Sequence, residues 1–222
     1  MALRLEIISA FLKQRPVGLP LDIFATQRSF DPADDTVWTH RLILHCADVL
    51  EFCFGNGDAT VIAREARWAV LKGFERLWEY HKPQSFVSIK EEEPDRNNGQ
   101  TFSLIWYLSD CQVLGVQYLD LARILLTVYD PDIPRLGLSS IAAANRASEK
   151  VRIIVSRILS NAISSQDMLP AQIAAHVAIS VCGHYFTDKN ERLSIVRLLR
   201  ELEELHAWPT GKTIAELKSA WT

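Results

Sequence analysis

The sequence has no surplus of positive charge. Its 222 residues include 24 Lys and Arg against 27 Asp and Glu, which gives a formal net charge of −3. Proteins that bind DNA or RNA normally display a basic stripe that neutralises the phosphate backbone. The charge balance therefore predicts that nucleic acid is not a partner.

Cysteine is scarce as well. The four cysteines, Cys46, Cys53, Cys111 and Cys182, all lie in apolar, helix-like stretches. Buried free thiols explain this placement better than a disulfide framework, which is typical of small secreted domains. We therefore expect a reducing compartment and a cytoplasmic location.

Long uncharged hydrophobic runs are absent too. The most apolar segment, 102–129, is interrupted by Asp110, Asp120 and Arg123, so it does not reach the roughly 18 uncharged residues of a membrane span. At the N-terminus, Glu6 breaks the apolar run, and basic residues with Pro16 follow where a signal peptide has small residues. We expect an amphipathic first helix and no membrane partner.

The usual signatures of nucleotide, nucleophile and metal chemistry are missing. No G-x-S-x-G elbow, Walker loop or G-x-G-x-x-G run occurs. On a helix, Cys46 and Cys53 would lie about 10 Å apart, too far to share one zinc ion. His40 and His45 are five residues apart, and Cys182 with His184 has no second pair nearby. The sequence predicts neither a metal nor a cofactor.

What the chain has is helical periodicity. Trp38, Leu42, Cys46, Val49 and Cys53 recur every three or four residues, and 48% of all residues are hydrophobic. We predict an all-α fold: one helical-bundle domain over 1–222, with seven to eight helices around a central apolar helix. The expected helices cover 2–14, 34–54, 59–80, 102–129 (the central one), 139–163, 170–181, 191–207 and 213–221. The polar segment 82–100 is expected to be a mobile loop.

Polar side chains embedded in these apolar helices are the candidates for a site, since a buried polar group needs a partner or a ligand. Three- and four-residue steps put Tyr107, Asp110 and Gln117 on one face of the predicted central helix. His45 lies beside the apolar stripe of the second helix. The alternative is structural: these groups tie helices together. We assign Asp110, His45 and Tyr107 as catalytic candidates. The ligand-binding candidates are Trp38, Trp106, Gln117 and Tyr118.

Three stretches together resemble a known family. They are LILHCADVLEFCFG at 42–55; IWYLSDC at 105–111, continuing as LARILLTVYDP at 121–131; and CGHYFTD at 182–188 with HAWPT at 206–210. The chain is similar over about 10–210 to the regulatory (middle homology) region of fungal zinc binuclear-cluster transcription factors. The resemblance implies a helical effector-type domain. The six-cysteine zinc cluster and the acidic activation tail of that family are missing here, so we expect no contact with DNA.

Two functions of different class follow. The first is a cofactor-independent cyclase or isomerase of fungal secondary metabolism, a pericyclase of the Diels–Alderase type acting on a polyketide or terpenoid. A shaped pocket can accelerate such a reaction by holding a reactive conformer beside one polar donor. The alternative is a truncated regulator, nuclear in location, that binds an effector or a full-length partner. Both require a hydrophobic small molecule or partner, and a homodimer is one of the states that the sequence allows.

Overall fold

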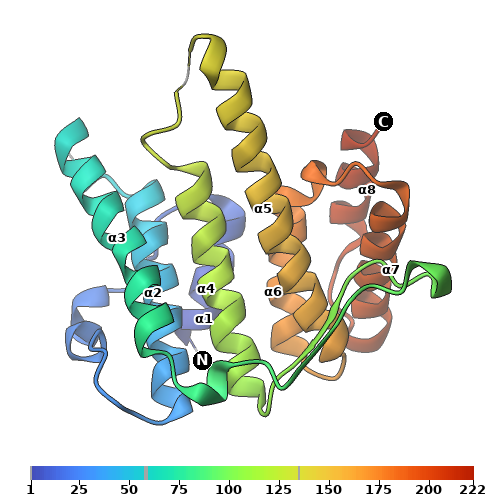
Figure 1. Cartoon of the computed structure of the whole chain (residues 1–222), viewed down its shortest axis with the longest axis horizontal. Helices are drawn as coiled ribbons and strands as arrows, with labels where there is room; N and C mark the ends of the chain where they lie inside the picture. The colour runs from blue at the N-terminus through green and yellow to red at the C-terminus, as the bar shows by residue number, and fades with distance from the viewer. Residues whose placement is uncertain (1, 58–59, 135) are drawn as a thin grey trace.

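The computed structural model describes residues 2–57, 60–134 and 136–222, and within them the chain is all-α (Figure 1). A two-stranded sheet is the sole β structure in the described residues. The helices are α1 (Ala2–Lys13), α2 (Asp35–Phe54), α3 (Val61–His81), α4 (Asp110–Val128), α5 (Leu138–Ser164), α6 (Leu169–Cys182), α7 (Lys189–His206) and α8 (Gly211–Ala220); the strands are β1 (Lys90–Glu92) and β2 (Leu104–Trp106). The predicted fold class is confirmed.

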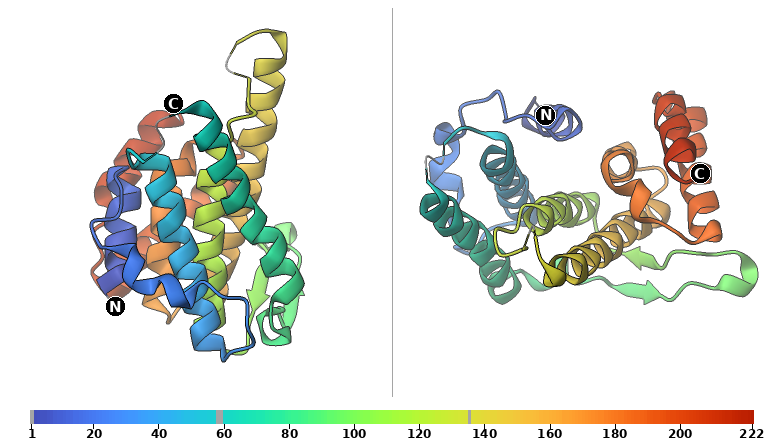
Figure 2. Two further views of the ribbon diagram at one scale, coloured as in Figure 1. Left: turned by 90° about the vertical axis from the view of Figure 1, so that its left-hand side faces the viewer. Right: turned by 90° about the horizontal axis from the view of Figure 1, so that it is seen from above.

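Helix α4 is the centre of the bundle, as predicted. It contacts α2, α5 and α6 extensively, and Figures 1 and 2 show it flanked by α2 and α3 on one side and by α5 on the other. Gly115 allows α2 and α4 to approach closely, because a Cβ there would lie 3.1 Å from both Leu42 and Phe86. By length and composition, α4 could cross a membrane, but 72% of its apolar window is buried inside the protein.

Side-chain capping marks where four of the helices begin, namely α2, α3, α4 and α7. Asp34 accepts a hydrogen bond from the Val37 amide and starts α2, and Gly55 follows its last residue. Asp188 accepts from the amides of Asn190 and Glu191, so α7 begins two residues before the predicted position. Asp58 and Ala59, where the third helix was expected to start, lie outside the described residues; α3 is capped by Thr60. Helix α5 begins at Leu138, one residue before the serines expected to cap it.

The predicted helix 102–129 is wrong over its first eight residues. Ser109 and Gln112 form a capping box that starts α4 at Asp110. The preceding segment is extended: Ile105 pairs with Glu91, and its amide donates to Ser164 Oγ on α5 at 2.8 Å. Ile, Trp and Tyr favour strands, and periodicity alone does not separate a short buried strand from a helix. The polar segment 82–100 supplies the other strand of this hairpin.

Candidate functional site

A large cavity lies at the end of the bundle where α4 begins. Its volume is 640 Å³, against 240, 250 and 290 Å³ for three others. We call it the α2–α4 groove. Its apolar lining is Leu3, Ile43, Leu114, Met168, Leu169 and Pro170; its polar lining is Arg4, Thr36, Thr39, His40, Asp110, Cys111 and Asp167. Four segments far apart in the sequence therefore meet around it.

Fixed contacts hold the walls of the groove in place. Thr39 Oγ1 on α2 donates to the Cys111 carbonyl on α4 at 2.6 Å. At the next residue of α4, the side-chain amide of Gln112 donates to the Asp35 carboxylate on α2 at 2.7 Å. Tyr118 is buried and donates from its hydroxyl to the Arg4 carbonyl at 3.4 Å, which fastens α1 to α4. The groove is thus bounded by rigid helices, as preformed ligand sites usually are.

The polar groups at the rim differ in charge. His40 is half-buried, and burial lowers its pKa, so its imidazole is neutral at pH 7 and offers one donor and one acceptor. Asp110 and Asp167 are exposed, and Asp110 is the first residue of α4, where the helix dipole stabilises a carboxylate. An apolar floor with a few polar groups at one edge can bind and orient an apolar molecule that carries a polar end.

Of the seven candidate residues, the structure brings only Asp110 to this groove. The predicted face from Tyr107 to Gln117 does not form, because Tyr107 lies outside the helix. Gln117 is fully buried and donates to the carbonyls of Ile158 and Ala171, which ties α4 to α5 and α6. Gln117 and Tyr118 thus make contacts that tie helices together, which is the structural alternative to a role in ligand binding.

The remaining candidates lie elsewhere in the fold. His45 is buried and stacks on Phe74 of α3. Trp38 is buried edge-on against Trp78, with ring centroids 5.7 Å apart. Trp106 lies on β2, where the Lys90 ammonium sits 5.2 Å from the centre of its ring. The three proposed catalytic side chains, His45, Tyr107 and Asp110, thus do not form one constellation.

Tyr107 instead lines a smaller cavity of 250 Å³, beside an ion pair in which the carboxylate is buried and the arginine is exposed. Asp120, 1% exposed, accepts from Nε of Arg157 at 2.7 Å and also from its Nη2, and Arg123 adds a third contact at 3.1 Å. Burial and the neighbouring Asp120 carboxylate raise the pKa of Tyr107 to about 12, so the phenol keeps its proton. Sequence reasoning missed this cluster, although a carboxylate inside an apolar helix indicates a buried partner.

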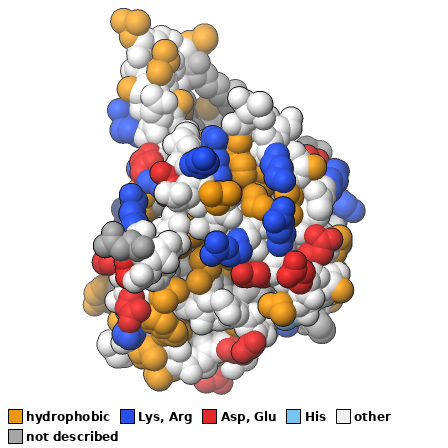
Figure 3. Space-filling model, turned by 90° about the vertical axis from the view of Figure 1, so that its right-hand side faces the viewer, with side chains coloured by type: hydrophobic (Ala, Val, Ile, Leu, Met, Phe, Trp, Pro, Cys, Tyr) orange, Lys and Arg blue, Asp and Glu red, His pale blue; other side chains and the backbone are white. Residues whose placement is uncertain are grey.

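Nothing in the described residues indicates a metal centre. No group of three or more His, Cys, Asp or Glu side chains is placed to hold an ion in that part of the chain. Burial raises the pKa of both Cys53 and Cys182 to about 12, which keeps these thiols protonated. Over α7, α8 and the hairpin, Figure 3 shows basic and acidic side chains interspersed, without a patch of one sign.

The comparisons with known proteins yield no relative. No protein-family model matches the chain, and neither a curated protein nor a solved structure is significantly similar to it. The resemblance to fungal regulatory regions therefore stays a prediction, and any function has to be argued from the groove itself.

Proposed function

We propose that the protein binds a predominantly apolar small molecule in the α2–α4 groove. The observation that carries the proposal is the groove itself: a cavity of 640 Å³ with apolar side chains from helices α1, α2, α4 and α6 and from Met168, which precedes α6. Small-molecule sites typically measure about 300–1,000 Å³ and combine an apolar lining with a few polar groups. Asp110 and His40 are the polar groups that would orient the ligand.

The second part of the proposal concerns whether the bound ligand is converted or released unchanged. In the cyclase hypothesis, the groove folds a flexible polyketide or terpenoid into a reactive conformer, and a rim group such as the His40 imidazole polarises it. In the regulator hypothesis, the ligand is an effector and is released unchanged. His45, Tyr107 and Asp110 lie in different parts of the fold, so the proposal rests on ligand binding in the groove, which both hypotheses share.

A blocking substitution tests the binding proposal. Thr36 is the second residue of α2 and lies at the edge of the groove, so Thr36→Trp places an indole in the cavity. Ser139 is the second residue of α5, is exposed and lies outside the groove, so Ser139→Trp is the matched control. The probe is Nile red, a neutral apolar dye whose fluorescence rises on leaving water. We expect saturable binding by the wild type and the control, and at least tenfold weaker binding by Thr36→Trp.

The opposite results are equally clear. Equal affinity for all three proteins would show that the dye binds elsewhere, and absence of saturable binding by the wild type would remove the groove as a ligand site. Conversion is then assayed by incubating the wild type and Thr36→Trp with linear polyene substrates. A cyclised product formed by the wild type alone would favour the enzyme over the regulator.

A further inference from the structure

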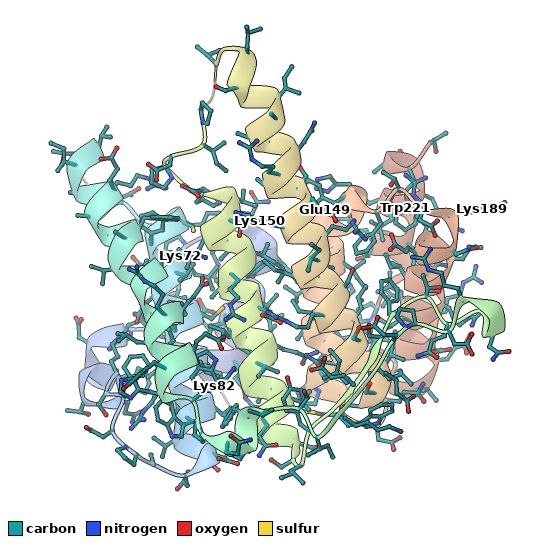
Figure 4. The ribbon with its side chains drawn as sticks, viewed as in Figure 1. Lys72, Lys82, Glu149, Lys150, Lys189 and Trp221 are labelled. Carbon is teal, nitrogen blue, oxygen red and sulfur yellow. The ribbon has the colours of Figure 1, made fainter. Side chains whose placement is uncertain are left out.

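Helix α3 carries apolar side chains on the face turned away from the bundle. Its inner face packs Trp68, Leu71, Phe74 and Trp78 against the core. On the outer side Ile62, Val70 and Tyr80 are 78%, 73% and 85% exposed. Figures 1 and 2 place α3 at the edge of the molecule, and Figure 4 shows its side chains projecting outward there. A surface helix with two apolar faces has one face without a partner.

The outer residues follow a regular spacing. Steps of four and three residues connect Ile62, Ala66, Ala69, Gly73, Arg76 and Tyr80. This is the a/d spacing of a helix that pairs with another helix. The middle of the stripe is small: a Cβ at Gly73 would meet only the end of the flexible Arg76 side chain, at 3.9 Å. A second helix backbone can therefore approach closely at Ala69 and Gly73.

We propose that two copies of this chain pair through α3, antiparallel and about a two-fold axis near residues 70–71. This register places Ile62 against the partner's Tyr80 and Ala69 against the partner's Gly73. The large apolar groups then cover the two ends of the stripe, and the small residues meet in the middle. A two-fold interface is self-complementary, so each contact occurs twice.

Charge complementarity indicates that the partner on the outer face of α3 is a second copy of this chain. Glu65 and Arg76 are exposed on the same side of the stripe, Glu65 beside it and Arg76 at its edge, and neither forms an ion pair with another described residue. In an antiparallel pair related by a two-fold axis, equal sides face each other, so Glu65 lies beside the partner's Arg76 at both ends. A parallel pair would instead turn this side towards the opposite side of the partner helix, which separates Glu65 from the partner's Arg76. The charges thus favour the antiparallel arrangement.

The other charged groups on this flank are already engaged within their own copy. The Lys72 ammonium contacts Glu75 at 2.9 Å, and Glu79 contacts both Lys82 and Arg123. These charged groups therefore neither require nor oppose a second copy of the chain. A pair of 21-residue helices is about 30 Å long, which is small for a permanent interface. We therefore expect a reversible dimer with a Kd on the order of 10 µM.

A charge-swap series tests the register directly. Glu65→Arg places two arginines together at each end, and Arg76→Glu places two glutamates there, whereas the double variant restores opposite charges. Sedimentation equilibrium over a concentration series gives the mass relative to the 25.1 kDa chain. We expect each single variant to raise the dimer Kd at least tenfold and the double variant to return it to within about threefold of the wild type. Arg200→Glu, an exposed charge on α7, is the control and should leave the Kd unchanged.

Three results would overturn the proposal. They are a wild type that stays monomeric at hundreds of micromolar, single variants that dimerise like the wild type, and a double variant that remains as weak as the singles. Circular dichroism of each variant checks that α3 stays folded, which its exposed substitution sites favour. Ala69→Glu, which places a charge at the centre of the stripe, should abolish the dimer in any register that uses this face.

Discussion

The imidazole of His45 lies flat on the ring of Phe74, with the ring centroids 4.0 Å apart and an angle of 7° between the planes. The two residues join α2 to α3 inside the core. Nε2 of His45 has no hydrogen-bond partner among the described residues. Burial and, to a smaller extent, the nearby Arg123 and Lys72 charges lower the pKa of His45 to about 3, so the ring is neutral and packs as an aromatic group.

This stacking predicts how stability depends on pH. Above pH 6.5 the imidazole is neutral in both the folded and the unfolded chain and contributes no pH dependence. As the pH falls from 6.5 towards 3, the unfolded chain gains a proton that the folded chain excludes, so stability is lost. At pH 5 the loss is about 2 kcal/mol. His45→Leu should remove it, and urea unfolding of both proteins at pH 7.5 and pH 5 measures the difference. If the wild type and His45→Leu lost the same unfolding free energy between pH 7.5 and pH 5, the result would contradict a buried neutral imidazole at His45.

The Asp120–Arg157 pair makes a second prediction about stability. Arg157→Met leaves the buried Asp120 carboxylate with Arg123 alone and should lower the free energy of unfolding by about 2–3 kcal/mol. Adding Asp120→Leu removes the stranded charge, so the double variant should recover most of that loss. Lys212→Met, on α8, breaks a pair with Glu216 in which both side chains are exposed and should cost at most about 1 kcal/mol. Urea denaturation of the wild type, the two single variants and the double variant measures their free energies of unfolding.

If Arg157→Met is no worse than Lys212→Met, the buried Asp120 carboxylate does not depend on Arg157 as the structure indicates. If the double variant is as unstable as Arg157→Met, the loss comes from packing of the arginine stem rather than from the unpaired carboxylate.

The helices could be predicted because their signals are local. The stripe on α2 lies within one element, and Asp34 and Gly55 mark its ends through the chemistry of capping. The start of α4 was missed because an apolar run continues through it, and only the Ser109–Gln112 capping box separates strand from helix. That spacing is present in the sequence, but the apolar run outweighed it in the prediction.

The site could be predicted only in part, because burial depends on distant residues. Asp110 and Asp120 lie in one apolar run and look alike in the sequence. In the structure Asp110 is exposed at the end of the bundle, whereas Asp120 is buried against Arg157, 37 residues further along the chain. Pairing over such a separation is decided by tertiary packing, which no local pattern contains. The groove likewise combines Leu3, His40, Leu114 and Met168.

Two glycines inside helices should respond in opposite ways to the same substitution. Gly115→Val forces side-chain atoms into Leu42, Phe86 and Thr39, all within 3.2 Å of the added Cβ, and should cost about 1–3 kcal/mol. Gly73 has open space around it, so Gly73→Val should be neutral or gain a few tenths of a kcal/mol from helix propensity. Thermal unfolding of dilute protein compares them. Equal melting temperatures would show that α2 and α4 are packed less closely than the structure describes.

The contact between Trp208 and His176 fixes the protonation state of a second buried histidine. The Trp208 indole N–H can only donate, and it donates to Nδ1 of His176 at 3.2 Å, so Nδ1 carries no proton. The proton of the neutral ring is therefore on Nε2, 3.1 Å from Thr213 Oγ1 of α8. Burial also lowers the pKa of His176 and therefore favours the neutral ring.

Two of the three side-chain partners of His176, Trp208 and Thr213, should shift its pKa in opposite directions; the third, Ser180 Oγ, lies 3.3 Å from Nε2. The Trp208 bond exists only in the neutral form, so Trp208→Phe should raise the pKa of His176. The Thr213 oxygen accepts from Nε2–H in both forms but more strongly from the cation, so Thr213→Val should lower the pKa. NMR titration of the imidazole nitrogens measures both variants against the wild type. No change in Trp208→Phe would contradict the hydrogen bond from Trp208 to His176, and a rise in Thr213→Val would show that the Thr213 hydroxyl donates to Nε2, so that the ring proton is not there.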